Sequence, residues 1–71
     1  MSTVRPDELV LQIVRDLETE HEFVLRVPAR QLQGVIDVKW AIKTAAHVLG
    51  RPVEAFERRA DGHVILVASL T

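Results

Sequence analysis

Residues 52–70, PVEAFERRADGHVILVASL, contain the features that decide the fold. Two runs suited to strands, 53–59 and 63–69, flank a short segment that contains Asp61 and Gly62. An Asp-Gly pair is favoured in two-residue hairpin turns because it tolerates the positive φ angles that such turns need. The second run is apolar at successive positions, as in a strand covered on both faces. These features predict a hairpin whose last strand is covered on both sides.

The stretch before the hairpin, Asp37–Leu49, is predicted to be a helix. Asp37 is a good N-cap residue, and Ile36 before it can pack onto the first turns as a hydrophobic staple. Gly50 suits the left-handed residue that follows a helix, and Pro52 prevents the helix from continuing. Both ends of this helix are therefore expected from local chemistry.

Two further elements precede this helix. Residues 6–20 carry apolar side chains at i, i+3 and i+4 spacing, and a proline at their start suits a first helical position. Residues 22–27 alternate in polarity, and the proline that follows ends a strand there. The segment Pro28–Ile36 either begins the next helix or forms a loop broken at Gly34. We favour the loop.

The predicted fold is of the α+β class, with α-β-α-β-β order in one small domain over residues 1–71. We expect a three-stranded mixed sheet with two helices packed on one face. If the first two strands are neighbours, the helix between them makes a right-handed parallel crossover. The opposite face of the sheet then exposes an apolar row, which a monomer should not leave open to water. That row is drawn from Val24, Phe56, Ile65 and Val67.

The size and composition of the chain favour a second subunit. A chain near 71 residues buries only about 60% of the surface that its unfolded form exposes, so its stability is marginal. There is no cysteine, so disulfides and thiolate zinc sites cannot supplement the core. Apolar residues nevertheless make up 48% of the sequence. We expect this surplus to be buried in a homodimer.

Charge and hydropathy give little indication of other partners. The net charge of −1 produces no strong field toward nucleic acid or an anionic membrane. No apolar run approaches the ~20 residues of a membrane helix. The opening, MSTVRPDELV, lacks the basic segment and apolar block of a secretory signal. We therefore expect no membrane partner and a cytoplasmic location.

Residue types that carry catalysis are few and scattered. Ser2 and Ser69 do not lie in a nucleophile-elbow pattern, and no glycine-rich phosphate loop is present. His21, His47 and His63 belong to three different elements, without the i, i+4 spacing typical of metal sites. We predict that the chain is not an enzyme and has no catalytic residues, no metal and no cofactor.

Trp40, the single tryptophan, falls on the helix face opposite the apolar positions 38, 42, 45 and 49. Either the first helix packs over that face and makes Trp40 a core residue, or Trp40 anchors an interface. Tryptophan is enriched among the residues that dominate binding energy. A third interpretation has Trp40 stacking on a nucleobase, with Lys39 and Lys43 contacting phosphates.

These observations predict a small non-enzymatic protein–protein interaction module, a homodimeric accessory or regulatory protein. One expected contact surface is on the second helix, with Ile36, Trp40, Lys43 and His47. The other is the outer sheet face, with Phe56, Ile65 and Val67. The alternative function is a nucleic-acid-binding regulator that uses a basic hairpin and helix face. Its contacts would be Lys39, Lys43, Arg51, Arg58 and Arg59, and the acidic residues between them make it the less favoured function.

Overall fold

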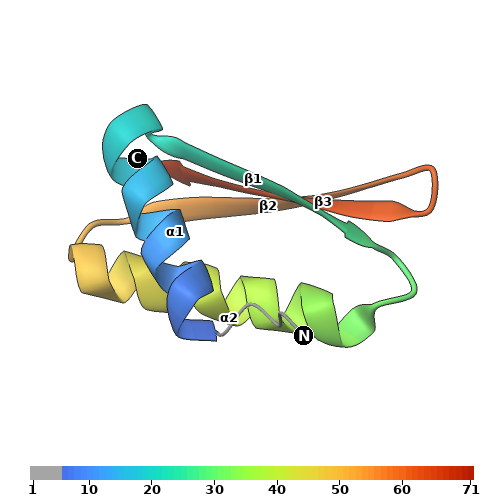
Figure 1. Ribbon diagram of the computed structural model, residues 1–71. Coiled ribbons are helices and arrows are strands. Elements are labelled where there is room, and N and C mark those ends of the chain that lie inside the picture. The colour runs from blue at the N-terminus through green and yellow to red at the C-terminus, as the bar shows by residue number, and fades with distance from the viewer. Residues whose placement is uncertain (1–5) are drawn as a thin grey trace.

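The structure, a computed structural model, describes residues 6–71 and contains two helices and three strands (Figure 1). The helices are α1 (Pro6–Glu20) and α2 (Leu32–Leu49). The strands are β1 (Glu22–Pro28), β2 (Val53–Ala60) and β3 (His63–Leu70). The α+β class and the order of elements are confirmed. Ser2 lies outside the described residues.

The strand order is β1-β3-β2, and β3 is antiparallel to both neighbours. The predicted mixed sheet with β1 beside β2 is therefore wrong. The two edge strands are parallel to each other, but β3 lies between them. The physical reason is the composition of the strands. β3 is apolar over most of its length and suits the centre of the sheet, whereas charged side chains on β1 and β2 are well tolerated at edges.

The hydrophobic core lies between the helices and one face of the sheet. Figure 1 shows α2 below the sheet, and α1 rising from the level of α2 to one end of the sheet. Its largest fully buried side chains are Phe23, Ile13 and Leu17. On β3 the buried residues alternate, because side chains at successive strand positions point to opposite faces. Val64, Leu66 and Ala68 are buried, whereas Ile65 and Val67 are only half-buried. Within one copy, β3 is thus covered on one face, not on both as its sequence predicts. The remaining core residues are Val10, Val27, Val35, Val38, Ala41, Ile42 and Ala45.

Helix α2 begins at Leu32, so the predicted loop over Pro28–Ile36 and the predicted start at Asp37 are wrong. Gln31 occupies the N-cap position without a side-chain hydrogen bond to the helix. Asp37 lies inside the helix, where its Oδ1 accepts a hydrogen bond of 2.9 Å from Gln33 Nε2.

Burial explains why the helix starts early despite its weak cap. The added turn brings Val35, which is 8% exposed, into the core. Gly34 lies in the same turn and allows it to approach β1 closely. A Cβ atom at this position would lie 3.2 Å from Val27 Cγ1. Packing against β1 therefore outweighs the lower helix propensity of glycine.

Three tight connections use residues with positive φ. Gly50 ends α2 with φ 66°, and its N–H donates to the carbonyls of Ala46 and His47. α1 is followed by His21, with φ 64° and a hydrogen bond from its N–H to the carbonyl of Leu17. The turn between β2 and β3 has φ 49° at Asp61 and 73° at Gly62, which confirms the predicted positive-φ turn.

The residues that follow the two helices should respond oppositely to substitution. Gly50→Ala should lower the free energy of unfolding by about 1 kcal/mol, because an L-residue is strained in the left-handed region. A Cβ at Gly50 meets nothing within 4 Å, so no steric clash adds to this cost. His21→Gly removes the same kind of strain and should leave stability equal or higher. Urea denaturation measures both, and a Gly50→Ala variant as stable as the parent would contradict the argument.

Candidate binding groove between α2 and β2

A groove of about 710 Å³ lies between α2 and the edge strand β2. Buried Ile42 and Leu66 line its inner part, whereas the rest of its lining is more exposed. The groove is therefore continuous with the core at its base and open to solvent above. The other lining residues are Ile36, Lys39, Trp40, Lys43 and Ala46 from α2, and Val53, Ala55, Phe56 and Glu57 from β2.

Small side chains on β2 leave the groove open. Ala55 pairs with buried Ala68 of β3 and therefore shares its helix-facing side of the sheet. Only a methyl group is available there to fill the space above α2. As a result, Ile36 remains 57% exposed and Trp40 52% exposed.

The position of Trp40 excludes one of the alternatives that its sequence left open. α2 turns Val38, Ala41 and Ala45 into the core, where they are 4% exposed or less. Trp40 lies off that face and is half exposed, so α1 does not cover the indole and Trp40 is not a core residue. The indole is instead part of the groove wall.

One ion pair joins the two sides of the groove. Lys39 Nζ lies 2.5 Å from Glu57 Oε1, and Arg59 Nε lies 3.8 Å from Glu57 Oε2. The hydrogen bond from Lys39 is the main reason why the pKa of Glu57 lies below its ordinary value of 4.5, with smaller contributions from the charges of Lys39 and Arg59. Partial desolvation opposes this lowering of the pKa. The pair is partly exposed, so it positions α2 against β2 more than it stabilises the fold.

The structure places the predicted interface residues on two surfaces. Ile36, Trp40 and Lys43 line the groove together with Phe56. His47 is exposed on α2 but does not line the groove. Ile65 and Val67 face the opposite side of the sheet. By its pairing with Val67, Phe56 belongs to that side too, and as an edge residue it borders both surfaces.

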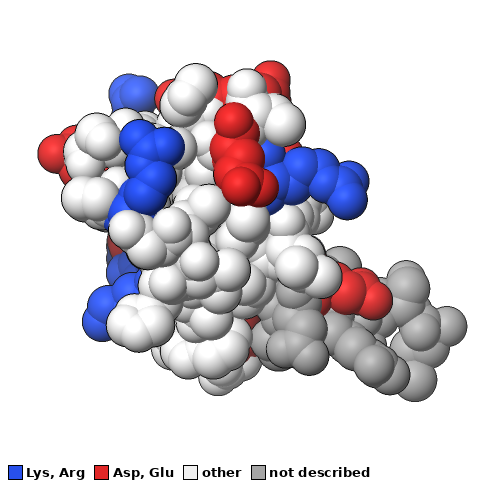
Figure 2. Space-filling view, turned by 90° about the vertical axis from the view of Figure 1, so that its left-hand side faces the viewer, with Lys and Arg blue, Asp and Glu red and all other residues white. Residues whose placement is uncertain are grey.

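The predicted nucleic-acid contacts do not gather on one face. Arg58 pairs with Ile65 and points away from the helices, whereas Arg59 pairs with buried Val64 and points toward them. Arg59 and Lys39 both lie beside the carboxylate of Glu57. Arg51 lies in the connection between α2 and β2. Figure 2 shows acidic and basic residues intermingled over the upper part of one side, above a central area of uncharged residues.

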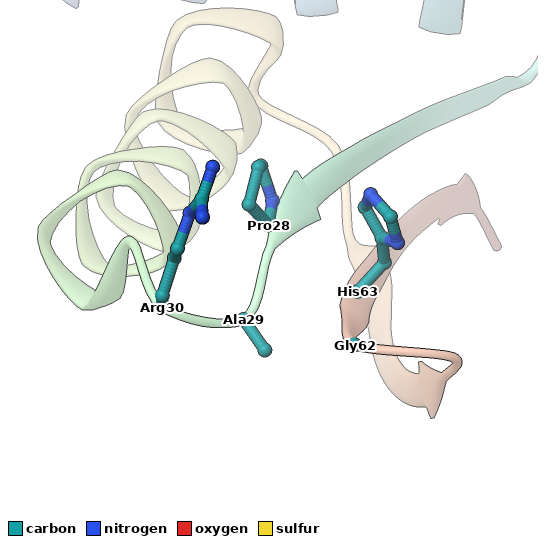
Figure 3. Close-up of a pocket in the computed structure, with 5 residues that line it drawn as sticks. All are labelled: Pro28, Ala29, Arg30, Gly62 and His63. Carbon is teal, nitrogen blue, oxygen red and sulfur yellow. The ribbon is translucent and has the colours of Figure 1, made fainter.

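A second hollow, of about 500 Å³, lies where the end of β1 meets the β2–β3 turn. In Figure 3 the rings of Pro28 and His63 extend to the same side, with Arg30 beside Pro28. The Ala29 N–H donates to the Gly62 carbonyl at 2.8 Å, which ties β1 to the turn. His63 Nδ1 lies 3.1 Å from the Asp61 carbonyl oxygen. These two contacts hold the turn and join it to the end of β1.

Other polar side chains are also engaged locally. Thr19 Oγ1 donates to the Arg15 carbonyl, and Thr44 Oγ1 donates to the Trp40 carbonyl. Within residues 6–71, no three His, Asp or Glu side chains gather as a metal ion would require. In the same part of the chain, neither helix has the length and apolar character needed to cross a membrane.

Sequence reasoning missed much of the β2 side of the groove. Val53, Ala55 and Glu57 alternate along β2 and could have been assigned to one face from that spacing. The position of these residues opposite α2 could not be predicted, because it depends on the order of strands in the sheet. For the same reason, the ion pair between Lys39 and Glu57 could not be predicted from the sequence.

Removing the lysine of this ion pair should raise the pKa of Glu57. In Lys39→Met we expect it to move toward 4.5, because the hydrogen bond to the carboxylate is lost. In the parent protein the folded pKa is the lower one. The pair's stabilisation is therefore present above the unfolded pKa and is lost as pH falls through the folded pKa.

An NMR titration of the Glu57 carboxyl carbon measures this shift. Lys43→Met is the matched control, because Lys43 also lines the groove but forms no ion pair among the described residues. An unchanged Glu57 pKa in Lys39→Met would show that the pair does not persist in solution.

Comparison of the chain with protein-family models, with curated proteins and with solved structures returned no match in any of the three. The groove must therefore be interpreted from its own chemistry. It combines a half-exposed indole, an edge strand and one bridging ion pair.

Proposed function

We propose that this chain is a small non-enzymatic protein–protein interaction module that acts as a homodimeric accessory or regulatory protein. Its partner site is the groove between α2 and β2, and its occupant is an extended segment of another protein. A cytoplasmic location is part of the proposal and rests on the sequence alone.

The observation that carries this proposal is the exposure of β2 beside an apolar groove. Every residue of β2 after Val53 is exposed, and the strand lies at an edge of the sheet. An edge strand presents backbone N–H and C=O groups that can pair with an added strand. Addition of a partner strand is a recurrent mode of peptide recognition, in which side-chain pockets supply the specificity.

The residues along β2 indicate where such a segment would pair. Glu57, Arg58 and Arg59 cluster toward the hairpin turn, and charged edges discourage strand addition. The first half of β2, Val53–Phe56, borders the groove and carries only one charge. We therefore assign the backbone pairing to that half.

The groove also indicates the chemistry of the partner. A strand added outside β2 would direct every second side chain toward the helix side of the sheet. Those side chains would cover Ile36 and Trp40, so apolar residues fit there. Lys43 lines the groove as an exposed cation, which favours an acidic residue at that end of the segment.

A peptide selection tests this site directly. A phage-displayed library of random extended peptides is selected on the purified protein, and the selected peptides are titrated against it. We expect peptides with alternating apolar residues, a blue shift of Trp40 fluorescence, and slower hydrogen exchange of β2 amides on binding.

Ile36→Ser should weaken binding of a selected peptide about tenfold, which corresponds to about 1.4 kcal/mol of lost apolar contact. Leu32→Ser is the matched control on the same helix. Leu32 is 68% exposed and does not line the groove, whereas Ile36 is 57% exposed and does. Equal loss in both variants, or peptides that leave the β2 amides unchanged, would contradict the assignment.

The nucleic-acid alternative is an outcome of the same assay. Single-stranded oligonucleotides are titrated while Trp40 fluorescence is followed at several salt concentrations. Tight binding that weakens steeply with salt would indicate phosphate contacts and would replace the peptide interpretation.

A further inference from the structure

The two edge strands carry the same spaced pattern of charge. β1 contains Glu22, Val24 and Arg26, and β2 contains Glu54, Phe56 and Arg58. Each set reads acidic, apolar, basic at alternate positions, and alternate positions of a strand share one face of the sheet. The two patterns form continuous rows across the sheet only if the two strands are aligned in register.

Pairing with β3 aligns the two sets in register. Glu22 and Glu54 both pair with Ser69, which makes an acidic row across the sheet. Arg26 and Arg58 both pair with Ile65, which makes a basic row. Between them, Val24 and Phe56 both pair with Val67 in an apolar row. We call the surface formed by these three rows the outer face, because it points away from the core.

No element among the described residues 6–71 covers the outer face. Val24 and Phe56 are each 54% exposed. Among residues 8–71, whose side chains the structure describes, the ion pairs within 4.0 Å are those of Glu57. The charges of the acidic and basic rows therefore have no opposite partner at that distance among these residues. In each row the two like charges lie on β1 and β2, with β3 between them, so no charge within a row neutralises another.

We propose that a second copy of this chain covers the outer face, with the two copies related by a two-fold axis that runs across the strands at the apolar row. This inference names the interface of the homodimer in the proposed function. It does not depend on what the groove binds.

The charge rows select this axis. A two-fold rotation about a line across the strands reverses the strand direction and leaves each strand above its own equivalent. Glu22 then lies opposite the partner's Arg26, and Glu54 lies opposite the partner's Arg58. Symmetry repeats both pairs, and Val67 meets the partner's Val67 at the centre. A rotation about a line along the strands would instead stack acid on acid and base on base.

Known dimensions of packed sheets allow these contacts. Facing sheets lie about 10 Å apart, and rows on a strand are about 6.7 Å apart. The side chains of glutamate and arginine together reach across that gap at the rim while the apolar row closes the centre. Three rows on three strands make a small interface, so we expect dissociation in the micromolar range.

Charge reversal of one row at a time tests the proposal. Arg26→Glu/Arg58→Glu makes both charged rows acidic, and Glu22→Arg/Glu54→Arg makes both basic. All four positions are exposed, and circular dichroism checks that each variant folds. Sedimentation equilibrium from about 10 μM to about 1 mM covers the expected range of dissociation constants.

We expect the parent chain to dimerise and each double variant alone to associate at least about tenfold more weakly, because like charges then face each other. An equimolar mixture of the two double variants should form a heterodimer. The quadruple variant, with both rows exchanged, should recover the self-association of the parent chain. Added salt should weaken the dimers of the parent chain, of the mixture and of the quadruple variant, because their ion pairs lie at the rim. It should not weaken the self-association of either double variant, because salt also screens the repulsion between facing like charges.

A parent chain that stays monomeric throughout this range overturns the proposal. So does a double variant that dimerises as tightly as the parent, since the dimer would then use another surface. Monomers that bind single-stranded DNA through Arg26 and Arg58 would assign the face to nucleic acid. None of these results affects the peptide assay, which reports on the groove through Trp40 on the other side of the sheet.

Discussion

The structure depends on the antiparallel pairing of β3 with both other strands. That pairing places the most apolar strand at the centre and turns Val64, Leu66 and Ala68 toward the helices. The same pairing determines which side chains lie on the opposite face of the sheet, because side chains at successive strand positions point to opposite faces. Ile65 and Val67 are left half-buried, and the rows that flank them are brought into register. The core and the outer face are therefore two consequences of one alignment.

The groove arises from the same alignment. β2 is joined to the sheet along one edge only, and its helix-facing positions include the short side chain of Ala55. α2 buries its apolar stripe in the core and leaves Trp40 on the open side. The ion pair between Lys39 and Glu57 joins the helix and the strand across this space. The indole of Trp40 is thus exposed because the short side chains of the edge strand β2 do not cover it.

The two proposed contact surfaces are compatible because they lie on opposite sides of the sheet. In a dimer formed through the outer faces, the helices of both copies point outward, and each copy keeps its own groove. Such a dimer presents two grooves, and two linked sites can bind a partner with repeated segments more tightly than one site does. Phe56 borders both surfaces.

Local sequence determined the elements but not their assembly. Apolar spacing predicted α1 over 6–20, and alternation predicted β1. The two runs on either side of Asp61-Gly62 predicted β2, β3 and the turn between them, with strand ends within a residue or two. The position of Trp40 off the apolar stripe of α2 was also predicted. These features depend on neighbours close along the chain. Strand order, the early start of α2 and the alignment of Glu22 with Glu54 were decided only in the tertiary structure. They depend on backbone pairing and burial between distant segments, which no local pattern encodes.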